Sequence, residues 1–124
     1  MTLYRIHMNA ARSDEFPLGS DKHGYDFVAP LDADGHLDPD AWKAHKQDCV
    51  VRRFSNGEPD ERGLLRHIGR GWTIDYDPNT PEGDEPFFKL DKHLISVGEY
   101  LSVLEDDGEM RTFHIVSVQP FLKK

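Results

Sequence analysis

The chain has 124 residues, and its 23 acidic side chains outnumber its 15 basic ones to give a formal net charge of -8. This length suits one domain, residues 1–124, and the negative charge disfavours nucleic acid or an anionic membrane as a partner. One cysteine excludes a disulfide within the chain, and no stretch approaches the roughly 20 apolar residues of a membrane-spanning helix. The first residues also lack the apolar segment of a secretory signal, so we expect a cytoplasmic location.

The N-terminal segment predicts a β-strand, because Tyr4, Ile6 and Met8 alternate with polar residues in the period of two of a half-buried strand. The mostly polar residues 10–24 contain a proline and two glycines, so we expect a long loop there. Aromatic and β-branched residues then predict a second strand.

A turn and a short helix are predicted next. Asp34 and Gly35 suit a tight turn, because glycine adopts a positive φ without steric cost. Asp38 is placed to cap the amino end of a helix, and Pro39 suits its first position. We therefore expect a short helix at about residues 39–47, which lies against the sheet because its apolar side is thin.

The middle of the chain predicts three more strands. Residues 49–54 and 64–68 are rich in apolar residues and are joined by the polar sequence SNGEPDERG. Residues 71–77 place Trp72, Ile74 and Tyr76 on one face, which predicts a further strand. The acidic, proline-containing residues 78–86 predict an exposed loop.

The last third carries the clearest pattern. Alternating apolar residues on both sides of the sequence DDG, residues 106–108, predict a β-hairpin. Val116 and Val118 fall on the opposite face from Phe113 and Ile115. Either a β-bulge redirects this strand or both of its faces are covered.

These elements together predict a mainly β fold. Sequential hairpins without long intervening helices favour an antiparallel curled sheet or a small open β-barrel of about six to eight strands, with one short α-helix. The alternative is a two-layer α+β arrangement.

Arginines gather in the middle of the chain, and guanidinium groups bind carboxylates and phosphates well. The hypothesis is an anion-binding patch, and the competing interpretation is that these arginines pair with acidic residues on the sheet surface. Strand alternation puts Arg52 and Arg53 on opposite faces, so one of them should point toward the core. The predicted ligand-binding residues are Arg52, Arg53, Arg66, His67, Arg70 and Trp72.

Acid–base chemistry is the alternative use of the ionisable residues, with His67, His93 or His114 beside Asp75. None of the seven histidines has the HxH or HxxxH spacing of a metal pair, and the acidic turns depart from the calcium-loop pattern, so neither a metal nor a cofactor is predicted. Cys49 precedes two valines and is expected to be a small buried side chain rather than a nucleophile.

Three functions are carried forward. The first is a non-catalytic binding or interaction domain for a small anionic molecule or an acidic peptide segment. The second is a small hydrolase or isomerase that uses histidine and aspartate in the mouth of a barrel. The third is a structural subunit, for instance a homodimer, that assembles by pairing exposed edge strands.

Overall fold

A computed structural model describes residues 3–68, 71–75, 85–88, 94–105 and 108–121. Helix α1 (Pro39–Ala44) and the 3-10 helix η1 (Lys46–Asp48) lie between the second and third of the strands in this part of the chain. The strands are β1 (Leu3–Ala10), β2 (Ser20–Pro30), β3 (Val50–Ser55), β4 (Glu58–Ile68), β5 (Gly71–Asp75), β6 (Glu85–Phe88), β7 (Tyr100–Leu104) and β8 (Met110–Phe121).

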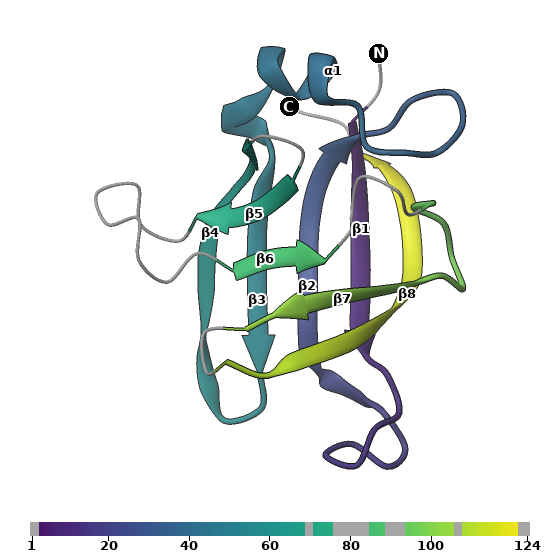
Figure 1. The fold of residues 1–124 in the computed structure, drawn as a ribbon, viewed down its shortest axis with the longest axis vertical. Helices are drawn as coiled ribbons and strands as arrows, with labels where there is room; N and C mark the ends of the chain where they lie inside the picture. Colours follow the sequence, from purple (N-terminus) through teal and green to yellow (C-terminus); the bar gives the residue numbers. More distant parts are fainter. Residues whose placement is uncertain (1–2, 69–70, 76–84, 89–93, 106–107, 122–124) are drawn as a thin grey trace.

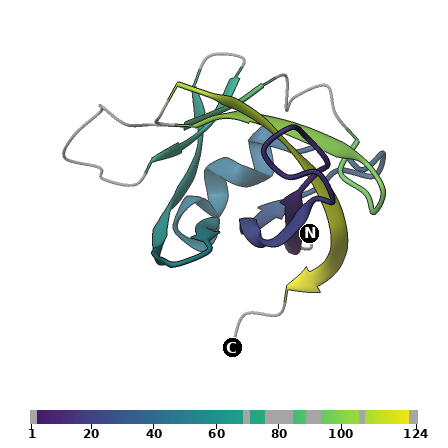
Figure 2. The same cartoon turned by 90° about the horizontal axis from the view of Figure 1, so that it is seen from below.

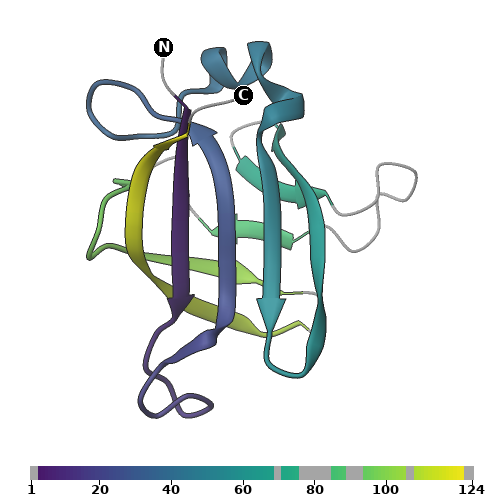
Figure 3. The same cartoon turned by 180° about the vertical axis from the view of Figure 1, so that it is seen from behind.

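The strands form one antiparallel barrel in which each strand pairs with the next along the chain, as Figures 1 and 3 show. β1 also pairs with β8, from Leu3 opposite Phe121 to Ala10 opposite Phe113, and this pairing closes the barrel. The predicted antiparallel β fold is therefore confirmed, with a closed strand order where an open barrel was expected. Closure gives β1 and β8 a hydrogen-bonded neighbour on both sides.

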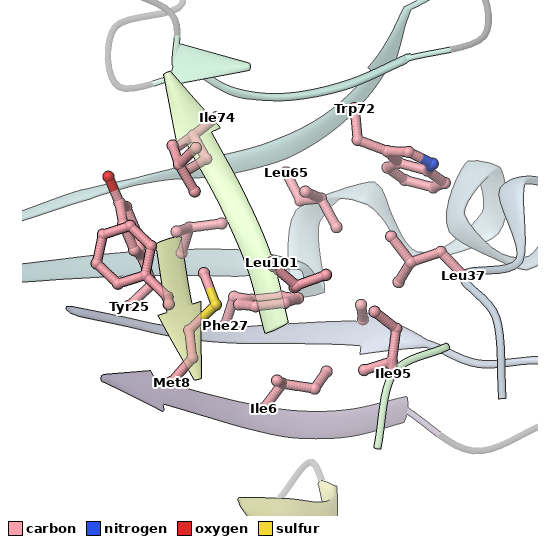
Figure 4. Close-up of a cluster of buried hydrophobic side chains, with 14 of the residues drawn as sticks. Ile6, Met8, Tyr25, Phe27, Leu37, Leu65, Trp72, Ile74, Ile95 and Leu101 are labelled. Atoms are coloured by element: carbon pink, nitrogen blue, oxygen red, sulfur yellow. The ribbon is translucent and has the colours of Figure 1, made fainter. Parts of the chain in front are cut away.

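Side chains fill the inside of the barrel, as is usual for an eight-stranded barrel of this size. The alternating residues of the strands supply them, and Figure 4 shows side chains from several strands meeting there. Among the described hydrophobic residues, those at most 1% exposed are Ile6, Met8, Tyr25, Phe27, Ala29, Cys49, Val51, Leu65, Trp72, Ile74, Leu101, Val103, Phe113 and Ile115.

α1 and η1 lie across one end of the barrel, at the top of Figure 1 and at the far end of the view in Figure 2. The predicted cap is present, since the Asp38 carboxylate accepts hydrogen bonds from the amides of Asp40 and Ala41. Trp42 is the buried residue of α1, and its Nε1 donates to the carbonyl of Leu65 at 2.8 Å. The helix thus attaches to the barrel through one large side chain.

In the described part of the chain, no helix has both the length and the apolar character that crossing a membrane requires.

Several predicted loops are shorter than expected. β2 begins at Ser20, inside the loop predicted for residues 10–24, and β6 includes Glu85 and Pro86 from the loop predicted for 78–86. β3 and β4 are joined at Asn56 and Gly57 alone. Polar sequence misled these predictions, because residues on the outer face of a barrel remain in contact with water while their backbones pair.

The predicted irregularity in β8 is a β-bulge. Met8 pairs with Ile115 whereas His7 pairs with Ser117, so the register shifts at Val116. Val116 is 39% exposed while Ile115 is fully buried. The extra residue changes which side chains face inward along the rest of the strand.

Gly24 marks a close approach of β2 to β1. A Cβ atom at this position would overlap the backbone carbonyl oxygen of Met8 and lie 3.0 Å from the Phe54 ring. We expect Gly24→Ala to lower the free energy of unfolding by about 1–3 kcal/mol, measured by urea denaturation, because backbone atoms must move to admit the methyl group. Lys22→Ala, at an exposed position of the same strand, should change it by less than about 0.5 kcal/mol. Equal stability of the two variants would contradict the close approach.

Candidate functional site

The described residues of the predicted anion patch do not form one surface. Arg52 lies on the outer wall of the barrel, and Arg53 points toward the inside with 13% of its side chain exposed. Arg66 lies near the other end of β4, and Arg70 falls outside the described residues. The alternation of the strand therefore separates neighbours in the sequence onto two sides of the wall.

Arg53 reaches a buried carboxylate, Glu105, at the end of the barrel away from α1. The Glu105 side chain is fully buried, and its Oε2 accepts from Arg53 Nε at 2.8 Å and from the Tyr25 hydroxyl at 2.6 Å. Its Oε1 accepts from Arg111 Nη1 at 3.0 Å and contacts His23 Nε2 at 3.1 Å. Both oxygens of this carboxylate are thus occupied.

The ionised state of Glu105 is strongly favoured. Burial would raise the pKa of this carboxyl group, but hydrogen bonds from His23, Tyr25 and Arg53, together with the charge of Arg53, lower it to about 2. Arg111 extends the network to the surface, where its Nε and Nη2 each lie 3.0 Å from an oxygen of Glu15. We interpret this cluster as a structural closure of the barrel end, because its polar groups already satisfy one another.

Arg52 is also engaged by carboxylates, on the outer wall. Its Nη1 donates to Asp60 at 2.9 Å, and its Nη2 lies 3.6 Å from Asp26. Asp26 in turn accepts from Arg5 Nε at 2.9 Å. This row of exposed and half-exposed ion pairs is the arrangement expected for the charged outer face of a sheet.

A cavity of about 580 Å³ lies where β4 and β5 meet the helical end of the barrel. This volume falls within the roughly 300–1,000 Å³ of small-molecule sites. We call it the cap cavity, and its lining residues are Trp42, Lys43, Lys46, Gln47, Leu64, Leu65, Arg66, His67 and Asp75.

The cap cavity combines cationic side chains with an apolar floor. Lys43 and Lys46 are exposed residues of α1 and η1, and the Lys46 ammonium group lies 5.0 Å from the centre of the Trp42 ring. Arg66 is 47% exposed, and its Nη1 donates to Asp75 Oδ2 at 2.9 Å. The ring centre of His67 is 6.0 Å from that of Trp42. Three permanent cations therefore share the cavity with one carboxylate.

The strand that borders this cavity contains buried polar atoms without partners. Asp75 has only 6% of its side chain exposed, and its Oδ1 accepts no hydrogen bond from the described chain. The Thr73 hydroxyl and the Trp72 Nε1 are also buried without a hydrogen-bond partner in that part of the protein. Such groups cost free energy unless something bonds to them, so each is an indication of a missing partner.

The other predicted residues lie elsewhere. His114 is on β8, where its ring centre is 4.9 Å from that of Tyr100, and His93 falls outside the described residues. Trp72 is 1% exposed and belongs to the core, with its ring centre 4.5 Å from that of His67. Of the predicted site residues, the cap cavity brings together Arg66, His67 and Asp75.

Sequence reasoning missed the two lysines of the cap cavity. Lys43 and Lys46 are three residues apart in a segment that was predicted to be helical. Residues at this spacing lie on the same side of a helix, so the sequence could have placed the two lysines together. Nothing near Glu105 in the sequence indicated its role, because its partners lie up to 82 positions away.

Metal and thiol chemistry have little support in the described residues. They contain no group of three histidine, cysteine, aspartate or glutamate side chains placed to hold a metal ion. Burial, with a smaller effect of the nearby charge of Asp48, raises the pKa of the Cys49 thiol to about 12, so its thiolate is disfavoured at neutral pH.

Comparisons with protein-family models, with curated proteins and with solved structures find no match for this chain.

Proposed function

We propose that this protein binds a small anionic molecule in the cap cavity and does not transform it. The single observation that carries the proposal is the convergence of Lys43, Lys46 and Arg66 on one cavity of ligand size. Guanidinium and ammonium groups are the usual partners of carboxylates and phosphates. The apolar floor formed by Trp42 and Leu65 excludes water below them and strengthens these interactions.

The net charge of -8 does not oppose such a site. A local excess of cations in a concave region attracts an anion. Charges more than about 8–10 Å away are largely screened at ordinary salt concentrations, so the nearest charges dominate. The excess negative charge elsewhere disfavours large polyanions, so the proposal concerns small molecules.

Acid–base catalysis is the second candidate, because His67 and Asp75 line the same cavity. Arg66 Nη1 donates a hydrogen bond to Asp75 in this cavity. The third hypothesis, assembly through edge strands, stays a prediction. Because the strand order is closed, two paired strands would have to separate before either could pair with another copy of the chain.

The test is a titration with inorganic phosphate at constant ionic strength, followed by the melting temperature and by the tryptophan fluorescence that Trp42 contributes. The wild type should show saturable binding, since phosphate at 100 times its Kd adds about 2.7 kcal/mol to the free energy of unfolding. The double variant Lys43→Ala/Lys46→Ala should bind at least about ten-fold more weakly, because two charge-assisted contacts are removed.

The matched control removes two positive charges from exposed sites outside the cap cavity, in Lys22→Ala/Arg12→Ala. Its phosphate affinity should stay within about two-fold of wild type, because charges beyond the Debye length are screened. An equal loss in both double variants would show that only the total charge matters, and the proposed site would then be abandoned. The absence of saturation at tens of millimolar phosphate would also rule out the proposed site.

A further inference from the structure

Asp75 is out of place in a site that binds only an anion, since a carboxylate repels the anion that the three cations attract. It is nevertheless almost completely buried at the wall of the cap cavity. Arg66 bonds to Oδ2 alone, and Oδ1 has no donor in the described chain. A buried carboxylate oxygen without a donor costs free energy unless a ligand or water supplies one.

We propose, resting on the function proposed above, that the ligand of the cap cavity is a small phosphorylated polyol. Its phosphate binds to Lys43, Lys46 and Arg66, and a hydroxyl group on the adjacent carbons donates to the Asp75 carboxylate. The ligand class thus follows from one cavity whose lining holds three cations and a carboxylate oxygen without a donor in the described chain.

The charge of the cavity favours a hydroxyl over an ammonium group as this donor. Arg66 already neutralises Asp75, so a second cation there would gain little. The ammonium groups of Lys43 and Lys46 are left with two positive charges, which match the charge of about -1.5 to -2 of a phosphate monoester at neutral pH. A neutral hydroxyl completes the hydrogen bonding of Asp75 and keeps this balance.

The exposure of Arg66 allows both contacts to form. Its side chain is 47% exposed whereas that of Asp75 is 6% exposed, so the arginine is the movable member of the pair. A guanidinium group has five N–H donors, and the hydrogen bond to Asp75 uses one nitrogen, Nη1. Its remaining donors are available to a phosphate. The apolar floor formed by Trp42 and Leu65 can contact the carbon atoms of the polyol.

The test compares glycerol 3-phosphate with propyl phosphate, two esters of the same charge and similar size that differ in their hydroxyl groups. Calorimetric titration of the wild type should show at least about ten-fold tighter binding of glycerol 3-phosphate, the value of one hydrogen bond to a charged acceptor. In Asp75→Asn this ratio should fall several-fold, whereas inorganic phosphate should bind as well as before or better, because a negative charge is removed. Asp21→Asn, an exposed site on β2, should keep the wild-type ratio.

The outcomes separate the two proposals. If the wild type binds both esters equally, the polyol inference is wrong and the anion site stands. If neither ester nor inorganic phosphate binds, the proposed function fails and this inference fails with it. A ratio that persists in Asp75→Asn would overturn the assignment of the hydroxyl to Asp75. The wild-type comparison decides the matter even if Asp75→Asn does not fold.

Discussion

Glu105→Gln should lower the free energy of unfolding by about 3–5 kcal/mol at pH 7, the usual cost of removing one member of a buried charge pair. The wild-type carboxylate is fully buried and accepts hydrogen bonds from Arg53, Arg111 and Tyr25. Glutamine has nearly the same shape but turns an NH2 group toward these donors and leaves the two guanidinium charges without their shared counter-charge. Urea denaturation would measure the change as a lower midpoint at constant slope.

Glu61→Gln is the matched control, because Glu61 contacts the same Arg53 at 3.9 Å with 49% of its side chain exposed. An exposed pair of this kind contributes about 0–1 kcal/mol. Similar losses in the two variants would mean that burial of Glu105 is unimportant, and the interpretation of the cluster as the closure of the barrel end would be wrong.

The same carboxylate predicts how stability changes in acid. Its pKa is lowered to about 2 in the folded protein, from the ordinary value of 4.5. A group whose pKa is depressed on folding stabilises the protein above its unfolded-state pKa and loses this contribution as the pH falls through the folded-state value. The wild type should therefore lose stability between about pH 4.5 and 2, and Glu105→Gln should lose less over that interval in parallel urea denaturations.

Phe113→Ala should lower the free energy of unfolding by about 3–5 kcal/mol, because it removes a buried aromatic ring and leaves a cavity. Phe113 is fully buried on β8, where its ring centre is 5.0 Å from that of Tyr25 and 5.7 Å from that of His23. The ring thus supports two of the donors that hold Glu105. Thermal and urea denaturation would both report the loss.

Tyr100→Ala is the control for this second variant. Tyr100 is an aromatic residue of the neighbouring strand β7, but it is 53% exposed and faces outward beside His114. Its removal should lower the free energy of unfolding by less than about 1 kcal/mol. If it were as costly as Phe113→Ala, the assignment of the inward and outward faces of β7 and β8 would be incorrect.

Local patterns in the sequence predicted most of the elements, although not β6, and the direction in which many of their side chains point. The alternation around Ile6 and Met8 identified both as core residues. The change of parity at Val116 predicted either a bulge or a strand covered on both faces, and the structure has the bulge. The Asp38 cap marked the start of α1. These features depend on a few neighbouring residues, so they can be recognised without knowing the rest of the fold.

The candidate site was less accessible to such reasoning. Alternation predicted that Arg52 and Arg53 point to opposite sides, but it said nothing of the carboxylate that each one meets. Glu105 lies 52 positions from Arg53, and the lysines of the cap cavity come from a helical segment that precedes β4 and β5. An arginine patch inferred from nearness in sequence was therefore divided by the barrel wall.

The amino-acid order of this chain specifies which residues face inward, where the short helix begins, and that antiparallel strands will dominate, since each of these follows from short-range periodicity and turn chemistry. Folding in three dimensions settles that β1 meets β8, which charges pair, and that Lys43, Lys46, Arg66 and Asp75 surround one cavity. The physical reason is that electrostatic and packing interactions depend on distance in space, and barrel closure brings together residues that are far apart along the chain.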